Sequence, residues 1–222
     1  MHRAKICTVH SEVSINFGGE TLTLSTLRTA FHSASSTLII SDLHLGKTTH
    51  FRNNALPIPK QALVADFRNL ETALNHFAPR RVCFLGDLFH STWNEEWTLF
   101  IRLMQDFAGI SKELIAGNHD ILHPDKYAEA DMVVLNKQEI NGLTLLHETT
   151  DQNNEFCISG HIHPGFKIKG KGRQSMVLPC FYLGQRQLIM PAFGSLTGKM
   201  PMKKVHENDE VWCFFENRFY PC

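Results

Sequence analysis

The chain has 222 residues, and its 22 lysine and arginine residues balance 22 aspartate and glutamate residues. Hydrophobic residues make up 43% and charged residues 20%, which is a globular composition and excludes a disordered chain. The zero net charge excludes a strongly basic nucleic-acid coat and an acidic solvating chain. The length suits one domain, so we expect a single unit over residues 1–222.

No apolar run reaches the ~20 residues that a membrane helix needs, and no apolar signal stretch follows Met1. The six cysteines occur without a Cys-x-x-Cys pair, and several lie inside apolar runs. Such cysteines are typical of buried, reduced thiols, so we expect a cytoplasmic protein that is not bound to a membrane. Histidine is the one unusual component, with 13 residues.

The first 31 residues contain strand-like pieces at 13–17 and 22–24 on either side of Gly18-Gly19, which predicts an N-terminal hairpin. Five short apolar runs follow, each typical of a buried strand. These runs are 38–40, 82–85, 114–116, 143–146 and 156–159.

Two helical patterns separate the first three apolar runs. From Lys60 to Phe77, apolar residues recur at helical spacing, and prolines flank the pattern at both ends. A second pattern runs from about Asn94 to Ala108, and the residues 92–95 predict a capping box at its start. Strands that alternate with helices predict an α/β fold, in which sites form beyond the carboxyl ends of the strands.

After about residue 164 the helical signal ends, and four segments have the pattern of strands. They either add a second sheet or extend the first. The expected organisation is an N-terminal hairpin at about 1–31, a motif-bearing core at about 38–164 and C-terminal strands at about 165–222. The four segments are 165–169, 174–183, 186–190 and 211–215.

Each of the five apolar runs leads into Asp, His or Asn, which are residue types that bind metal ions. In Asp-x-His and His-x-His, residues two apart point the same way on an extended backbone, so each pair can approach an ion from one side. Glycines at 86, 117 and 160 allow sharp turns just before the ligands. The candidate ligands are Asp42, His44, Asp87, Asn118, His147, His161 and His163.

Seven oxygen and imidazole ligands exceed the needs of one tetrahedral ion and favour two ions that share a carboxylate. The ligand types favour manganese, iron or zinc over calcium. Asn118 supplies a neutral oxygen, which limits the negative charge of a site that must accept an anion. Single Asp-x-His or Gly-Asp pairs are common by chance, whereas five such strand endings in succession are specific.

The ligands fall into five motifs. These are Asp42-x-His44, Gly86-Asp87-x-x-His90, Gly117-Asn118-His119-Asp120, His147 and Gly160-His161-x-His163. Together they resemble the calcineurin-like metallophosphoesterase superfamily over about residues 38–164. The resemblance implies two mixed β-sheets packed as a sandwich and flanked by helices, with a dinuclear metal site at the C-terminal ends of the strands. It also implies how the ligands divide: Asp42, His44 and His163 for one ion, Asn118, His147 and His161 for the other, and Asp87 as the bridge.

A narrower resemblance rests on the segments 41–47, 50–52 and 56–59, which have the sequences Ser-Asp-Leu-His-Leu-Gly-Lys, His-Phe-Arg and Leu-Pro-Ile-Pro. They are similar to the bacterial ligase-associated DNA damage response endonuclease family, and Met-Pro-Ala-Phe-Gly-Ser-Leu-Thr-Gly at 190–198 fits the same family. Lys199 departs from it, because a second glycine is expected there. The resemblance implies a manganese-dependent phosphodiesterase that cuts DNA in repair, with an ATP-dependent DNA ligase and a large helicase as partners.

Three further residues are predicted to be catalytic. His119, next to ligand Asn118, is the natural general acid, and Asp120 would orient it. His90 resembles a histidine of the nuclease subunit of the double-strand-break repair complex, which implies that it positions a phosphodiester. The alternative is that His119 and His90 have only structural roles.

Four basic residues are predicted to bind substrate phosphates. Lys47 and Arg52 closely follow the first ligand pair. Lys167 and Lys169 alternate with Ile168 in a ribbon that could track a nucleic-acid backbone. The alternative is that these residues belong to a charged, solvated surface.

The favoured substrate is single-stranded or structured DNA. One alternative is a small-molecule phosphodiesterase that acts on cyclic nucleotides or nucleotide diphosphates, and another is a metal-binding scaffold without activity. The sequence has no long cap insertion, which favours an open site for a polymer, and it has every ligand type, which favours an enzyme. The oligomeric state and the preference for internal or terminal bonds stay open.

Overall fold

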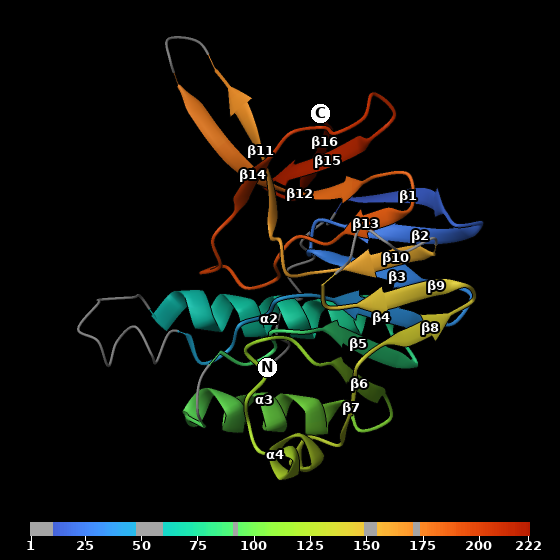
Figure 1. Cartoon of the computed structure of the whole chain (residues 1–222). Coiled ribbons are helices and arrows are strands. Elements are labelled where there is room, and N and C mark those ends of the chain that lie inside the picture. Colours follow the sequence, from blue (N-terminus) through green and yellow to red (C-terminus); the bar gives the residue numbers. More distant parts are fainter. Residues whose placement is uncertain (1–10, 48–59, 91–92, 149–154, 171–173) are drawn as a thin grey trace, which may run out of the picture.

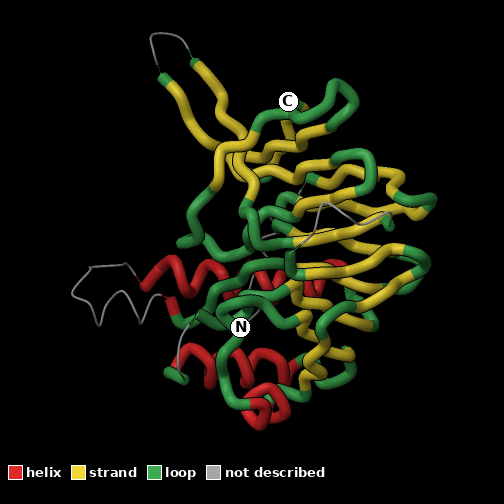
Figure 2. The backbone as a smooth tube through the Cα atoms, in the orientation of Figure 1, coloured by secondary structure: helices red, strands yellow, loops and turns green. Residues whose placement is uncertain are grey.

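The computed structural model describes residues 11–47, 60–90, 93–148, 155–170 and 174–222. Two β-sheets pack face to face, and the helices α2, α3 and α4 cover the outer face of one of them (Figure 1 and Figure 2). Within these ranges, no helix combines the length and the hydropathy needed to cross a membrane. The arrangement confirms the predicted sandwich of two mixed sheets, with the described helices on one side only.

The first sheet has seven strands in the order β1-β2-β3-β4-β5-β6-β7. Its first four strands pair antiparallel and its last four pair parallel. The parallel half follows from the crossover helices, because parallel neighbours cannot be joined by a tight turn. The strands are β1 (Glu12–Phe17), β2 (Glu20–Ser25), β3 (Thr29–His32), β4 (Thr37–Ile40), β5 (Arg81–Leu85), β6 (Ser111–Ile115) and β7 (Met132–Leu135).

The N-terminal hairpin is confirmed as β1 and β2, which pair in a register that places Ile15 opposite Leu22. The turn contains Gly18 and Gly19 at φ of 62° and 86°, a left-handed pair that suits a two-residue hairpin. The hairpin is not a separate unit, because β3 pairs with β2 on one side and with β4 on the other.

The helices that link the parallel strands are α2 (Lys60–Phe77), α3 (Glu95–Asp106) and α4 (Pro124–Glu129). α2 has the predicted bounds, whereas α4 was not predicted. The predicted capping box at 92–95 is wrong for α3, because Asn94 is the N-cap and its Oδ1 accepts a hydrogen bond from Glu96 N at 2.9 Å. Asn94 has an extended backbone and a short acceptor side chain, which are the features that an N-cap needs.

The second sheet has the order β14-β11-β12-β13-β10-β9-β8; β15 pairs with β12, and β16 pairs with β15. The predicted C-terminal strands therefore add a second sheet, which also includes the strands that lead into His147 and His161. The short strands β8, β14 and β16 were not predicted. The strands are β8 (Gln138–Ile140), β9 (Leu143–Leu146), β10 (Phe156–Ser159), β11 (Pro164–Lys169), β12 (Ser175–Leu183), β13 (Gln187–Ile189), β14 (Met200–Met202), β15 (Glu210–Phe215) and β16 (Arg218–Pro221).

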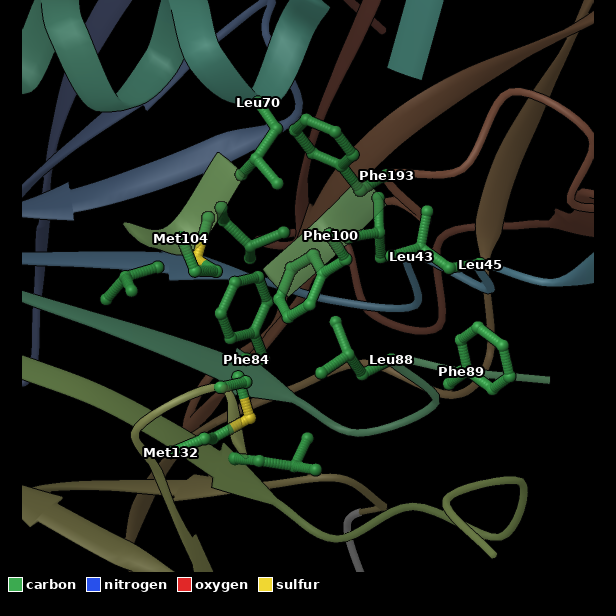
Figure 3. Packing of buried hydrophobic residues seen from close by; sticks show 14 of the residues in the cluster. Leu43, Leu45, Leu70, Phe84, Leu88, Phe89, Phe100, Met104, Met132 and Phe193 are labelled. Atoms are coloured by element: carbon green, nitrogen blue, oxygen red, sulfur yellow. The ribbon is translucent and has the colours of Figure 1, made fainter. Parts of the chain in front are cut away.

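Two large apolar clusters lie on opposite faces of the first sheet. On β5, Val82 and Phe84 point into the cluster under the helices, whereas Cys83 and Leu85 point into the cluster between the sheets. This alternation explains the continuous apolar run of β5, because both faces of the strand are buried. Figure 3 shows part of the helix-side cluster, in which Phe84 packs near Phe100.

Candidate metal centre

The candidate ligands follow the C-terminal ends of strands in both sheets and converge at one place. They form two groups, and within each group the ligand atoms all lie within 4.8 Å of one another. Asp87 belongs to both groups. The first group is Asp42, His44, Asp87 and His163, and the second is Asp87, His147 and His161.

Asp87 directs its two carboxylate oxygens toward different groups. Oδ2 lies 3.6 Å from Nε2 of His44, and Oδ1 lies 3.6 Å from Nε2 of His147. Asp87 is only 3% exposed, so its charge needs nearby compensation. A carboxylate placed in this way between two donor groups suits a ligand shared by two cations.

The remaining donor atoms also lie close together. Nε2 of His163 is 3.2 Å from Oδ1 of Asp42 and 3.4 Å from Nε2 of His44. Nδ1 of His161 is 3.1 Å from Nε2 of His147. Neighbouring imidazole nitrogens that converge with carboxylates form a donor set that divalent transition metals prefer, so the residues fit a metal centre.

The histidine tautomers are set by contacts behind the cluster. Nδ1 of His147 lies 2.9 Å from the carbonyl oxygen of Leu85, so an Nδ1–H donates there and Nε2 faces the cluster with a free lone pair. Burial, together with the nearby charges of Lys47 and His163, lowers the pKa of His44 to about 2. His44 is therefore the neutral imidazole that a metal ligand must be.

The predicted extended backbone of the ligand pairs is wrong. Asp42 and His44 have φ of 51° and 49°, and His161 and His163 have φ of 68° and 53°. Asp87 shares this left-handed conformation at 49°. Non-glycine residues rarely adopt it, and they persist there only where the surroundings dictate the conformation. The side chains thus converge because the backbone coils around the centre.

Glycines before the ligands leave room for the centre. A Cβ on Gly86 would lie 2.1 Å from Nδ1 of His147, and one on Gly160 would lie 2.4 Å from Oδ2 of Asp42. Gly86 also has φ of 74°, which agrees with the predicted sharp turn. At Gly160 the reason is space, because its φ lies outside the left-handed region.

Asn118 and His119 lie beside the centre and are exposed. The backbone N–H of His119 donates to Oδ1 of Asp87 at 2.9 Å, which places this loop against the shared carboxylate. The His119 ring lies 4.0 Å from the ring of His90 and 5.6 Å from the ring of His44, measured between centroids. The structure therefore brings His90 and His119 together at the edge of the first group.

The sequence suggested that Asp120 orients the His119 ring, but in the structure its carboxylate accepts hydrogen bonds from backbone N–H groups. Its Oδ1 accepts hydrogen bonds from Leu88 N and Phe89 N, and its Oδ2 accepts one from Gly117 N. Burial raises the pKa of Asp120 to about 6, and these hydrogen bonds oppose the rise. Asp120 thus joins the loop after β5 to the loop after β6.

The predicted substrate-binding residues have different outcomes. Lys47 lines a small cavity with His44, and Asp42 and Asp87 raise its pKa while burial lowers it more strongly. Lys167 and Lys169 are exposed on β11, which begins directly after His163 and extends away from the sandwich with β12 (Figure 1). Arg52 lies outside the described residues.

Two acidic residues near the centre were missed from the sequence. Oε1 of Glu148 lies 3.7 Å from Nε2 of His161, and no motif pointed to it. Asp66 on α2 is 7% exposed and contacts a loop behind the ligands. A signal for Asp66 did exist, because it lies four residues before Leu70 on the apolar face of the helix.

The comparisons with known proteins agree with this geometry. The sequence matches the model of the family described as calcineurin-like phosphoesterase over residues 35–180. The chain belongs to the calcineurin-like phosphoesterase family. The predicted superfamily and fold are therefore confirmed, and the chain is a metallophosphoesterase whose clustered His and Asp residues suit a divalent metal site.

The fold of this calcineurin-like phosphoesterase also occurs in a solved structure. The crystal structure of Pseudomonas putida nuclease MPE is 23% identical, with a TM-score of 0.80, and the match covers 96% of this chain and 100% of that chain. Two weaker matches have TM-scores below 0.5. Protein AQ665 from Aquifex aeolicus is 19% identical, with a TM-score of 0.41, and the match covers 62% of this chain and 82% of that chain. The E. coli phosphoesterase Yfce is 14% identical, with a TM-score of 0.40, and the match covers 79% of this chain and 86% of that chain. A comparison of the sequence with curated proteins gives no match.

Proposed function

We propose that this metallophosphoesterase is a manganese-dependent phosphodiesterase that cuts DNA at internal bonds. The observation that carries the proposal is the shared carboxylate of Asp87, whose two oxygens face two separate groups of donors. Two divalent ions would be held by Asp42, His44 and His163 on one side and by Asn118, His147 and His161 on the other. Iron or zinc would fit the same donors.

Ions bound there would supply Lewis-acid activation of a water molecule and of the scissile phosphate. The protein's own residues would then handle the substrate and the proton. His119 is exposed beside the centre, so its ring can reach a leaving oxygen on a large substrate and protonate it. His90, whose ring lies next to that of His119, would bind a phosphate oxygen.

Two features favour a polymer over a small substrate. The donor groups lie beside exposed residues such as His119 and partly exposed His161, so a long strand can pass the centre. Lys167 and Lys169 continue from His163 along the arm formed by β11 and β12. At ~3.3 Å per residue, they lie roughly 13 and 20 Å along the chain from His163, within the span of a few nucleotides.

The cellular setting is proposed from the narrower resemblance and from the cysteines. No disulfide joins the described cysteines, Cys83, Cys157, Cys180, Cys213 and Cys222, which supports a cytoplasmic location. A role in DNA repair with an ATP-dependent DNA ligase and a large helicase follows from the resemblance to the ligase-associated endonucleases, and the likeness in fold to a nuclease agrees with it. We also propose that residues 1–222 act as one domain.

Circular single-stranded DNA in Mn²⁺ tests the proposal, because a circle is linearised only by an internal cut. We expect cleavage by the wild type and none by Asp87→Asn. The matched control is Asp125→Asn, which changes a carboxylate that is 85% exposed on α4. Turnover of bis(p-nitrophenyl) phosphate without DNA cleavage would favour the small-molecule phosphodiesterase, and Mn²⁺ binding without any turnover would favour the inactive scaffold.

A further inference from the structure

The segment Pro191–Thr197, which we call the support segment, packs against Ser41–His44, which we call the ligand loop. Three hydrogen bonds join them across about 150 residues of sequence. They are Ser41 Oγ to Pro191 O at 3.0 Å, Phe193 N to Ser41 O at 2.9 Å, and Gly194 N to Asp42 O at 3.1 Å. The carbonyl oxygens of Ser41 and Asp42 thus accept hydrogen bonds from the support segment, whereas the N–H groups of Asp42 and His44 donate to the carbonyl oxygens of Gly86 and Asp87.

Packing reinforces these hydrogen bonds. A Cβ on Gly194 would lie 2.5 Å from the carbonyl oxygen of Leu43, so the two backbones touch at a distance that only glycine allows. Phe193 is 1% exposed and inserts into the core near Leu70 and Leu43 (Figure 3). The ligand loop therefore cannot shift without displacing the support segment.

Two charged residues hold the support segment from its other side. Both oxygens of Asp66 on α2 accept a hydrogen bond from Ser195 N, at 3.1 and 3.0 Å, and Oδ2 also accepts one from Ser195 Oγ at 3.0 Å. Nη1 of Arg28 donates to the carbonyl oxygen of Phe193 at 2.8 Å. Asp66 is 7% exposed, so these contacts form away from bulk water and are strong.

The ligand loop needs such support because its backbone is unfavourable by itself. Asp42 and His44 both have left-handed φ values, which cost free energy in non-glycine residues. The Asp42 carboxylate also accepts the N–H of His161 at 2.9 Å and lies 3.2 Å from His163. A movement of the ligand loop would thus disturb donors contributed by the other sheet.

We propose that Asp66 is a positioning residue for the metal centre, which it reaches through Ser195 and the support segment. By fixing the support segment, Asp66 holds Asp42 and His44 in the conformation that binds the first ion. The inference rests on the proposed function, because it assumes that these residues bind a divalent ion. The inference gives the 190–198 motif and α2 a role in metal binding, although neither contributes a ligand.

Mn²⁺ binding to the metal-free protein tests this inference without substrate or turnover. We expect Asp66→Ala to weaken one of two Mn²⁺ sites about 10- to 100-fold and to leave the other within a few-fold, which is the usual cost of losing support behind a ligand. Ser195→Ala should have a smaller effect, because it retains the N–H bond to Asp66. Asp66→Asn should recover part of the affinity, because its amide oxygen still accepts the Ser195 N–H.

Two matched variants separate positioning from general stability. Glu71→Gln changes an exposed carboxylate on the same helix and should leave binding unchanged. Leu74→Ala removes buried apolar contacts of α2, so it should lower the melting temperature but not the Mn²⁺ affinity measured well below that temperature.

Equal Mn²⁺ affinities of folded Asp66→Ala and wild type would overturn the inference and leave the proposed function intact. A similar loss of affinity in Leu74→Ala would overturn it as well, because Asp66 would then act only through stability. If the wild type itself bound no Mn²⁺, the proposed function and this inference would both be wrong.

Discussion

The ligand loop and the loop Gly117–Asp120, which we call the acid loop, both contact Asp87 and differ in exposure. Asp42 and His44 in the ligand loop are 0% and 6% exposed, whereas Asn118 and His119 in the acid loop are exposed. The ligand loop is held by the support segment, whereas the acid loop is held mainly through Asp120 and the contact of His119 N with Asp87.

The difference suits the separate tasks that we propose for the two loops. A cation needs ligands in a fixed geometry, which burial and backbone hydrogen bonds provide. A general acid must reach the leaving group of a large substrate, which requires exposure. The comparison also predicts that substitutions of His44 and of His119 have different consequences for metal binding and for turnover, whereas Asn118 in the acid loop belongs with the proposed ligands.

The largest effect is expected for Asp87, which belongs to both donor groups. Asp87→Asn should lower kcat by more than about 10³-fold, because each ion supplies several kcal/mol of transition-state stabilisation. It should also weaken Mn²⁺ binding, which calorimetry can measure. Normal cleavage by this variant, with Asp125→Asn as the control, would show that the two donor groups do not act through a shared carboxylate.

The next largest effect is expected in the acid loop. His119→Ala should lower kcat on DNA by about 10²- to 10⁴-fold. On bis(p-nitrophenyl) phosphate the loss should be less than about 10-fold, because nitrophenoxide leaves without a proton. Mn²⁺ affinity should stay unchanged.

The control for His119 is His123→Ala, at an exposed position before α4. Equal losses on the two substrates would contradict a general acid. A loss of Mn²⁺ affinity would remove the distinction between the two loops.

The support of the ligand loop should also appear in the pH dependence of stability. The pKa of Asp66 is raised from an ordinary value of 3.8 to about 6, mainly because the carboxyl group is buried. The hydrogen bonds from Ser195 and the charge of Arg28 lower this pKa, and the charge of Glu96 raises it. A carboxyl group with a raised pKa in the folded state adds stability below its unfolded pKa, and that contribution disappears as the pH rises through the folded pKa.

The variant Asp66→Asn does not titrate at this position and is the reference. Between about pH 4 and pH 7, the free energy of unfolding of the wild type should fall by about 2 kcal/mol relative to the variant. Urea unfolding of the metal-free proteins measures this difference. Parallel pH profiles of the two proteins would show that the pKa of Asp66 is not raised.

The smallest effect is expected on the arm of β11 and β12, which extends the exposed side of the site. Lys167→Gln and Lys169→Gln should each raise KM for DNA a few-fold. Each should also reduce the steepness with which the logarithm of the DNA-binding constant falls with the logarithm of the salt concentration, by about 0.7, the value for one phosphate contact on a single strand. Lys137→Gln changes an exposed lysine paired with Glu139 and is the control. If the variants show the same salt dependence of DNA binding as the wild type, the bound DNA strand does not contact this arm.

The chemistry of the site could be predicted from the sequence better than its local geometry. Asp42, Asp87 and His147 follow apolar runs, and parallel strands bring such endings together. The left-handed backbone of Asp42 could not be predicted, because the partners of its N–H and carbonyl groups, Gly86 and Gly194, lie far away in the sequence.

The parts of the fold that were missed are those with weak local signals. β7 exposes Val133 and Val134 on the edge of its sheet, so its apolar residues do not alternate with polar ones. β14 has only three residues, and its central Pro201 argues against a strand. α2 was predicted with its observed bounds because its apolar spacing and flanking prolines agree.

The number of Mn²⁺ ions per chain tests the shared metal centre most directly. Metal-free protein would be titrated with Mn²⁺ while the free ion is followed by electron paramagnetic resonance. We expect two ions per wild-type chain and one per chain in His147→Ala, which removes a donor from the second group only. One ion per wild-type chain, or two in His147→Ala with unchanged affinities, would contradict a centre in which Asp87 joins two ion-binding groups.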